Sequence, residues 1–214
     1  MPAGGRAWGH SSTVSPKRVS MTRSTVRMRA DFKVVLDACV LAPPALCDLL
    51  LRLAERPRLY SPRWGKDILD EVHRTQVNRL GFPPELADYW RTEVETHFPE
   101  ALIENYAPLI DICDNDEKDR HVLATAIRAG AELIVTSNLR HFPNSCLENW
   151  DIHSRHPSEF LINLYTMDSG IVVSKLVAIA EDRKVPPQRI LGKLTTTVPA
   201  FSKYNAEDLN WILD

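Results

Sequence analysis

The stretch Lys33-Val-Val-Leu-Asp37 predicts a buried β-strand that ends in an acid. A short apolar run with β-branched residues is typical of a strand that is covered on both faces. In open parallel sheets, ligands bind outside the carboxyl ends of the strands, and Asp37 stands at such an end. Asp37 could simply terminate the strand, but the sequence returns at once to Ala-Cys-Val-Leu, which is hard to explain as surface. Asp37 is therefore a candidate site residue.

Helical and strand patterns alternate along the rest of the chain. Helices are expected over 43–55, 62–79, 84–97, 116–129 and 157–165, and further strands at 109–113, 133–136 and about 150–153. Strands separated by helices predict an α/β fold with a mainly parallel, doubly wound sheet. Apolar clusters and a Pro-Pro pair in the remaining C-terminal part predict two or three more helices. Those helices could pack on the core or form an apolar groove for a partner helix.

The composition is that of an ordinary globular protein, with 214 residues, 44% hydrophobic and 25% charged. No apolar run approaches the roughly 18–20 residues of a membrane-spanning helix, and the first residues lack the apolar segment of an export signal. The four cysteines are far apart and lack the spacing of a disulfide framework. We expect a soluble, cytoplasmic protein with reduced thiols and no membrane partner.

The net charge of −2 hides an asymmetry between the start of the chain and the rest. Residues 1–30 hold six Lys and Arg and no acid, so the remaining residues together carry −8. The basic segment is rich in Ser, Thr and Gly, which is typical of a disordered tail. An acidic remainder disfavours a broad phosphate-binding surface, since affinity for nucleic acid comes mainly from Lys and Arg. It favours an acidic site that holds a cation.

Several acids are expected to meet at the carboxyl edge of the sheet. Asp116 and Asp119 open the helix that follows a later strand, although acids at a helix start also stabilise it by about 0.5–2 kcal/mol. Glu71 joins them if the 62–79 helix turns that side inward; Asp67 and Asp70 are the alternatives. Crowded carboxylates repel unless a hard cation neutralises them, and Mg²⁺ or Mn²⁺ prefers such oxygen ligands.

Four stretches of the sequence resemble the PIN-domain family in order, spacing and residue type. They are Val34-Val-Leu-Asp-Ala-Cys-Val-Leu41, Ile68-Leu-Asp-Glu-Val72, Asp116-Glu-Lys-Asp-Arg-His-Val-Leu-Ala-Thr-Ala126 and Ile134-Val-Thr-Ser-Asn-Leu-Arg-His-Phe-Pro143. The resemblance covers about residues 32–166, and the helices after it look like those of a subgroup of VapC-type toxins. It implies a PIN-like three-layer α/β/α domain over 31–166 and a helical C-terminal extension over 167–214.

The resemblance also implies catalytic residues. The family has an Asp after the first strand, a Glu on a helix and an Asp in a D-x-x-D helix start, which match Asp37, Glu71 and Asp119. A fourth acid, frequent in the family, is Asn138 here, so a second metal ion should bind more weakly than in an all-acid site. Asp116 could supply part of the missing charge as a further metal ligand.

The implied activity is that of a Mg²⁺- or Mn²⁺-dependent endoribonuclease, in which metal-activated water hydrolyses an RNA phosphodiester. The resemblance further implies a toxin of a type II toxin–antitoxin pair, with a cognate antitoxin as partner, and a homodimer. Ser137 and Asn138 would orient the attacking water, unless they only form a turn. Ser137, Arg140 and His141 are candidates for substrate binding, and a solvated loop is the alternative for the last two.

Two other classes of function remain to be weighed. A haloacid-dehalogenase-type phosphatase also has an Asp after its first strand, but it needs a second acid two residues later, where this chain has Cys39. The other alternative is a catalytically weak PIN scaffold that binds RNA or protein, and Asn138 is the reason to consider it.

Overall fold

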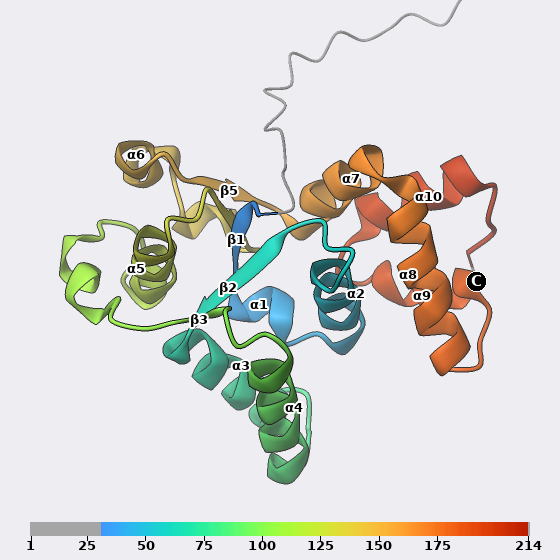
Figure 1. Ribbon diagram of the computed structural model, residues 1–214, viewed down its shortest axis with the longest axis horizontal. Coiled ribbons are helices and arrows are strands. Elements are labelled where there is room, and N and C mark those ends of the chain that lie inside the picture. Colours follow the sequence, from blue (N-terminus) through green and yellow to red (C-terminus); the bar gives the residue numbers. More distant parts are fainter. Residues whose placement is uncertain (1–30, 214) are drawn as a thin grey trace, which may run out of the picture.

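Five parallel strands form the central sheet of residues 31–213, the part of the chain that the computed structural model describes (Figure 1). The strand order is β3-β2-β1-β4-β5. The strands are β1 (Lys33–Leu36), β2 (Ser61–Gly65), β3 (Leu102–Ile103), β4 (Leu133–Val135) and β5 (His153–Arg155). This sheet confirms the expected α/β class. The basic tail expected over 1–30 lies outside the described residues.

β1 lies at the centre of the sheet because its side chains are suited to complete burial. Val34, Val35 and Leu36 are each 0% exposed. Val34 lies in register with Pro62 of β2 on one side and with Leu133 of β4 on the other. The central strand therefore delivers Asp37 to the middle of the sheet's carboxyl edge.

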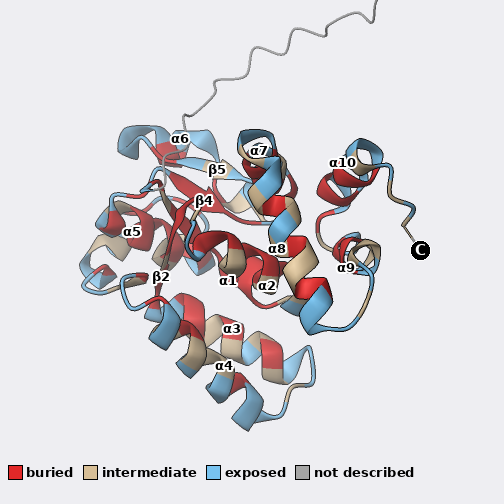
Figure 2. Ribbon diagram, turned by 45° about the vertical axis from the view of Figure 1, so that its right-hand side comes forward, coloured by how far each residue is buried: buried red, intermediate tan, exposed pale blue. Residues whose placement is uncertain are grey.

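Helices lie on both sides of the sheet (Figures 1 and 2). α5 (Arg120–Ala129) packs against β1, β2 and β4. α1 (Ala38–Leu41) and α2 (Pro44–Ala54) lie on the other side, and Figure 2 shows that much of both helices is buried. α3 (Lys66–Asn78) follows β2 directly and forms a hairpin with α4 (Pro84–His97). The remaining elements before the C-terminal helices are short: η1 (Ala107–Ile112), η2 (Glu117–Asp119), η3 (Leu139–His141), α6 (Asn144–Leu147) and η4 (Glu148–Trp150).

Two of the expected elements were wrong. The helix expected over 62–79 begins only at Lys66, because Ser61–Gly65 is strand β2. Ser-Pro-Arg-Trp-Gly has no β-branched residue, and it is a strand because β1 and β3 pair with it on both sides. The strand expected at 109–113 is instead the 3-10 helix η1, and the strand of that region is the two-residue β3.

The C-terminal helices pack onto the core through α2. They are α7 (Pro157–Met167), α8 (Ser169–Asp182), α9 (Pro187–Leu194) and α10 (Pro199–Leu209). Three ion pairs join α8 and the residue after it to α2 and its C-cap: Arg52–Asp182 at 2.6 Å, Arg183–Asp48 at 2.5 Å and Lys175–Glu55 at 3.5 Å. The buried core continues into these helices through residues such as Leu176 and Phe201. The expected domain boundary between 166 and 167 stays a prediction.

No single helix among residues 31–213 is long and apolar enough to cross a membrane. α7 and α8 reach the required length and composition only when they are taken together, and they are bent by 115° to one another.

Candidate active site

An open pocket of about 660 Å³ lies between α3, the start of α5 and the loop that follows β4. Its lining residues are Asp67, Glu71, Arg74, Thr75, Asn78, Arg79, Lys118, Asp119, His121, Asn138 and His141. Four residues selected from the sequence, Glu71, Asp119, Asn138 and His141, are therefore brought together. They come from three separate segments, as expected at the carboxyl edge of a parallel sheet.

Asp37 lies between β1 and α1 and is only 2% exposed. Its carboxylate accepts a hydrogen bond from the Thr136 hydroxyl at 2.6 Å and from the Cys39 thiol at 3.1 Å. Both bonds engage the Oδ2 atom, and no side-chain donor among residues 31–213 bonds the Oδ1 atom. Asp37 also acts electrostatically on Glu71 and Asp119, which places it beside the pocket.

The loop after β4 is tied to Asp37 through the same two side chains. Thr136, which is 0% exposed, accepts a hydrogen bond from the Asn138 backbone N–H at 3.0 Å. Cys39 accepts one from the Ser137 backbone N–H at 3.2 Å. Burial first, and the Asp37 charge second, raise the pKa of the Cys39 thiol to about 12. The thiol thus keeps its proton at neutral pH and can donate it to Asp37.

Glu71 lies on the pocket face of α3, and Asp70 does not. Asp70 bonds Arg91 of α4 at 2.6 Å and Lys66 at 2.7 Å, so it faces the helix hairpin. Burial raises the pKa of Glu71, and the charges of Asp37 and Asp119 raise it further. His121 Nε2 lies 3.8 Å from the Glu71 carboxylate and lowers this pKa.

The orientation of α3 is fixed where it leaves β2. A Cβ at Gly65 would lie 2.7 Å from both Thr125 Oγ1 and the Tyr106 ring, so this contact requires glycine. The Tyr106 hydroxyl donates to the Asp67 carboxylate at 2.9 Å and accepts from the Asp67 backbone N–H at 3.0 Å. Asp67 is thereby engaged by Tyr106 while Glu71, one turn later, faces the acids of the pocket.

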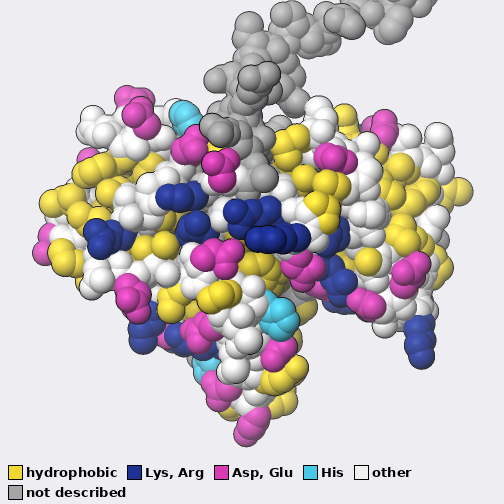
Figure 3. Space-filling view, in the orientation of Figure 1, with side chains coloured by type: hydrophobic (Ala, Val, Ile, Leu, Met, Phe, Trp, Pro, Cys, Tyr) yellow, Lys and Arg dark blue, Asp and Glu magenta, His cyan; other side chains and the backbone are white. Residues whose placement is uncertain are grey.

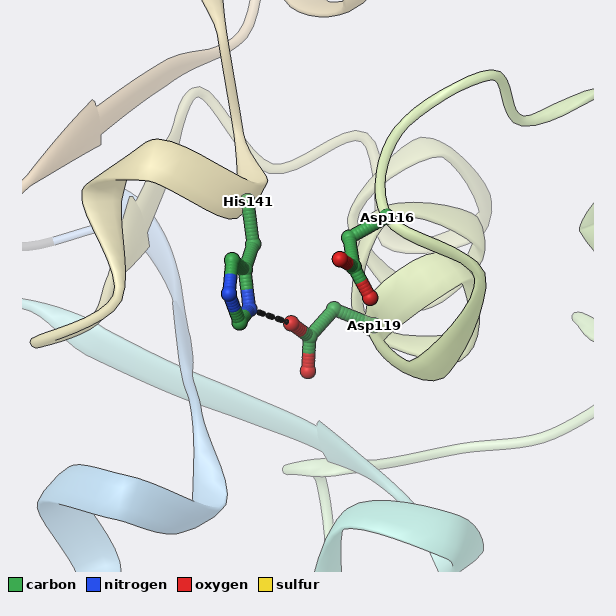
Figure 4. A group of neighbouring side chains, drawn as sticks. All are labelled: Asp116, Asp119 and His141. Carbon is green, nitrogen blue, oxygen red and sulfur yellow. Dashed lines mark hydrogen bonds and ion pairs between the residues drawn. The ribbon is translucent and has the colours of Figure 1, made fainter.

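Asp119 and His141 form a bonded pair at the other wall of the pocket (Figure 4). His141 Nδ1 lies 2.5 Å from Asp119 Oδ2, and Arg140 Nε donates to His141 Nε2 at 3.1 Å. Because Nε2 accepts, the ring proton is on Nδ1 and is donated to Asp119. Asp119 is 7% exposed. Its burial raises its pKa, as do the charges of Asp37 and Asp116, whereas the bond from His141 lowers it.

The remaining candidates lie at the edge of the site. Asp116 is exposed and accepts a hydrogen bond from the Lys118 backbone N–H at 3.1 Å, as a helix N-cap does. One potential ligand atom of Asp116 nevertheless lies within 4.8 Å of such atoms in Asp119 and His141. Ser137 and Arg140 are exposed and are not among the pocket-lining residues.

Sequence reasoning missed three cations of the pocket, Arg74, Arg79 and Lys118. Arg74 follows Glu71 by three residues, a spacing that places both on one face of a helix, and Arg79 is the C-cap residue of α3. This spacing was available in the sequence. The spacing alone could not identify a pocket residue, however, because the sequence did not decide whether Glu71, Asp67 or Asp70 faces inward.

The chemistry of the donor set fits a divalent cation, although among the described residues the three ligand atoms that lie within 4.8 Å of one another belong to Asp116, Asp119 and His141. Asp37, Glu71 and Asp119 offer only carboxylate oxygens, which Mg²⁺ and Mn²⁺ prefer. Among residues 31–213, no Lys or Arg forms an ion pair with any of the three; Glu71 and Asp119 have histidine neighbours, and Arg74 acts on Glu71 without a direct ion pair. Burial is the largest cause of the raised pKa of Glu71 and of Asp119, and the charge of Asp37 raises both further, so the acids also repel one another. A bound cation would relieve this repulsion.

A parallel sheet with helices on both sides, whose central strand presents an Asp beside a helical Glu and an Asp at a D-x-x-D helix start, is the arrangement of a PIN domain. The comparison with known proteins agrees. Over 132 residues the chain is 37% identical to a curated protein of Mycobacterium tuberculosis (strain ATCC 25618 / H37Rv) named "Putative ribonuclease VapC50". The match covers 60% of this chain and 76% of the relative. The chain belongs to the VapC-type PIN-domain family.

No model of a known protein family matches the chain, and no solved structure matches it either.

Proposed function

We propose that the protein is a metal-dependent endoribonuclease that hydrolyses RNA phosphodiester bonds in the pocket between α3 and α5. The observation that carries this proposal is that Asp37, Glu71 and Asp119 act on one another electrostatically while no Lys or Arg of residues 31–213 forms a direct ion pair with any of them. Such a set of acids is suited to holding Mg²⁺ or Mn²⁺. The name of the mycobacterial relative supports RNA as the substrate.

The side chains around the acids have distinct tasks in this proposal. A divalent ion held by Asp37, Glu71 and Asp119 would lower the pKa of a bound water and neutralise charge on the phosphate. Thr136 and Cys39 hold the Asp37 carboxylate in one orientation by donating to Oδ2. His141 does the same for Asp119. Outer partners of this kind orient metal ligands and tune them.

Asn138 provides a neutral oxygen where an acid would add charge. It is half-buried at the pocket wall, and its backbone N–H is fixed by Thr136. We assign it to the orientation of the attacking water. Asp116 would serve as an auxiliary ligand on the side of Asp119, because the two lie within reach of one ion.

The cellular role follows from the family rather than from the pocket. We propose that the protein is the toxin of a type II toxin–antitoxin pair, acts as a homodimer in the cytoplasm, and is inhibited by a cognate antitoxin. The VapC name of the relative supports this role.

Incubation of the purified protein with RNA tests the activity. Cleavage is expected with Mn²⁺ or Mg²⁺, should stop with EDTA, and should return when the metal is restored. The variant Asp37→Asn should not cleave. Asp151→Asn is the matched control for it, because Asp151 is exposed and has a left-handed backbone (φ 53°) that Asn tolerates. RNA that is bound but stays intact at every metal concentration would support the scaffold alternative and overturn the proposal.

A further inference from the structure

Three cations stand on the rim of the same pocket that holds the acids. Arg74 lies on α3, Arg79 is the C-cap residue that follows α3, and Lys118 lies in η2 on the opposite wall. All three are exposed, whereas Asp37 and Asp119 are buried. The pocket therefore has acidic side chains at its base and basic side chains at its mouth.

These cations are not held in ion pairs with carboxylates, unlike eight of the other Lys and Arg residues in the described part of the chain. Figure 3 shows Lys and Arg side chains gathered in a band across one face, over α2 and β2, with Asp and Glu close by. Many basic residues are paired with carboxylates, among them Arg52, Lys66, Arg91, Lys175 and Arg183. No ion pair within residues 31–213 engages Arg74, Arg79 or Lys118. Their charge is available to an external anion.

The positions along α3 match an extended ligand. Arg74 lies one turn after Glu71, and Arg79 lies eight residues after it, about 12 Å along the helix axis. Arg74 is close enough to lower the pKa of Glu71. Arg79 is more distant from the acids and would contact a group beyond the one at the base of the pocket. Lys118 precedes Asp119 directly and approaches from the other side.

The residues that line the pocket are suited to contact the phosphates of an RNA rather than its bases. It contains no Phe, Tyr or Trp, the residues on which unpaired bases stack. The cleaved phosphate must reach carboxylates that are 2% and 7% exposed, Asp37 and Asp119. A flexible single strand can bend into such a site, whereas the phosphates of a duplex are held on a stiff cylinder.

We propose that Arg74, Arg79 and Lys118 bind backbone phosphates that flank the cleaved one in a single-stranded RNA. This inference rests on the proposed function, because it assumes that an RNA phosphate occupies the acidic base of the pocket. It explains how a protein whose residues 31–214 carry a net charge of −8 can hold a polyanion: a few cations without ion pairs act at one place.

RNA binding without cleavage tests the proposal. The full-length chain carrying Asp37→Asn is titrated with a labelled single-stranded RNA in Mg²⁺, between about 50 and 200 mM salt. The test variant adds Arg74→Ala, Arg79→Ala and Lys118→Ala. The matched control adds Arg128→Ala, Arg189→Ala and Lys193→Ala, which remove the same three charges from exposed positions outside this pocket.

Counter-ion release gives the expected size of the effect. Each phosphate contact on a single strand contributes about 0.7 to the slope of log affinity against log salt, so the test variant should lose about 2 from that slope. Its affinity at about 50 mM salt should fall by roughly tenfold or more. The loss should be the same for RNAs of different base sequence, and the control should keep the parental slope.

The outcomes separate this inference from the proposed function. Equal slopes and affinities in test and control variants, or no RNA binding by the parent, would overturn the phosphate assignment even if the wild type cleaves RNA. If only the test variant loses RNA affinity and the wild type never cleaves RNA, the phosphate assignment stands and the proposed nuclease activity is wrong. Thermal unfolding of each variant shows whether a loss of RNA affinity comes from a damaged fold. If the triple variant is unfolded, the three single substitutions are tested instead.

Discussion

Thr136 donates its hydroxyl hydrogen to the Asp37 carboxylate at 2.6 Å, although the two residues are 99 positions apart in the chain. They stand at the carboxyl ends of the neighbouring parallel strands β1 and β4. The same hydroxyl oxygen accepts the Asn138 N–H, so one buried group fixes both an acid and the loop beside it. Several properties of the site depend on this contact.

Replacement of the hydroxyl separates its two roles. Thr136→Val keeps the shape but leaves the Asp37 carboxylate without its hydroxyl donor and the Asn138 N–H unpaired, which should cost about 1–3 kcal/mol of unfolding free energy. Loss of an outer partner should also weaken metal binding by about 10- to 100-fold. Thr136→Ser restores the hydroxyl and should bind Mn²⁺ nearly as the wild type does. Calorimetric titration measures the Mn²⁺ affinity of the two variants. Equal affinity of the Val and Ser variants would contradict the role of the hydroxyl.

Asp37→Asn should abolish RNA cleavage and leave the fold intact. The amide has almost the same shape and can still accept from Thr136, but it removes one ligand charge. Because Asp37 acts on Glu71 and Asp119 by repulsion, the metal-free variant should unfold at the same temperature as the wild type or at a higher one. Wild-type expression should arrest growth, and expression of the variant should not. Full cleavage activity in Mn²⁺ would remove Asp37 from the site.

Glu71 should give the metal-free protein a pH-dependent instability. Burial, and then the charge of Asp37, raise the pKa of Glu71 above the 4.5 that is usual for this carboxyl. The folded state therefore binds its proton more tightly than the unfolded state does. The corresponding stability is present below the unfolded pKa and is lost as the pH rises through the raised folded pKa.

Glu71→Gln isolates this contribution. In EDTA, the variant should gain unfolding free energy relative to the wild type between about pH 4 and about pH 7. Urea denaturation at several pH values measures the difference. Glu159→Gln, at an exposed position of α7, is the control and should show little change with pH. If the difference in unfolding free energy between Glu71→Gln and the wild type stays constant or shrinks as the pH rises, Glu71 does not face the other acids.

Asn138→Asp should tighten Mn²⁺ binding by about tenfold, since ligand charge is a main determinant of affinity for hard cations. Asn138 lines the pocket near Asp119, so an added carboxylate would face the proposed ion. The metal concentration needed for half-maximal cleavage should fall in parallel. The added charge also increases repulsion in the metal-free site. An unchanged or weakened Mn²⁺ midpoint would show that Asn138 acts through hydrogen bonding or lies outside the site.

The strongest local patterns in the sequence predicted the centre of the fold. The apolar run before Asp37 is the central strand, and the helix before Gly130 ends where expected, with Gly130 in the left-handed conformation (φ 59°). β2 could not be read in the same way. Ser61–Gly65 has no strand-like composition, and its structure comes from two neighbouring strands that lie far from it in sequence.

The candidate site was predictable where single residues mark the ends of elements. Asp37 and Asp119 stand at such ends, so their convergence followed from the sheet topology. The choice of Glu71 over Asp70 depended on Arg91 of α4, which binds Asp70 at 2.6 Å and could not be placed from the sequence. The rim cations were missed for the same reason, because the direction of α3 is set by Tyr106 and Gly65 rather than by its own residues.

The order of these segments along the chain has a consequence for synthesis. Asp37 is made early, but its hydroxyl partner is residue 136, and the histidine bonded to Asp119 is residue 141 of 214. β4, which carries this part of the site, also pairs with the central strand, so β1 lacks one neighbour until then. A ribosome must therefore complete about two-thirds of the chain before the carboxylates can be aligned. Chains that terminate before residue 141 therefore lack part of the hydrogen-bonded site.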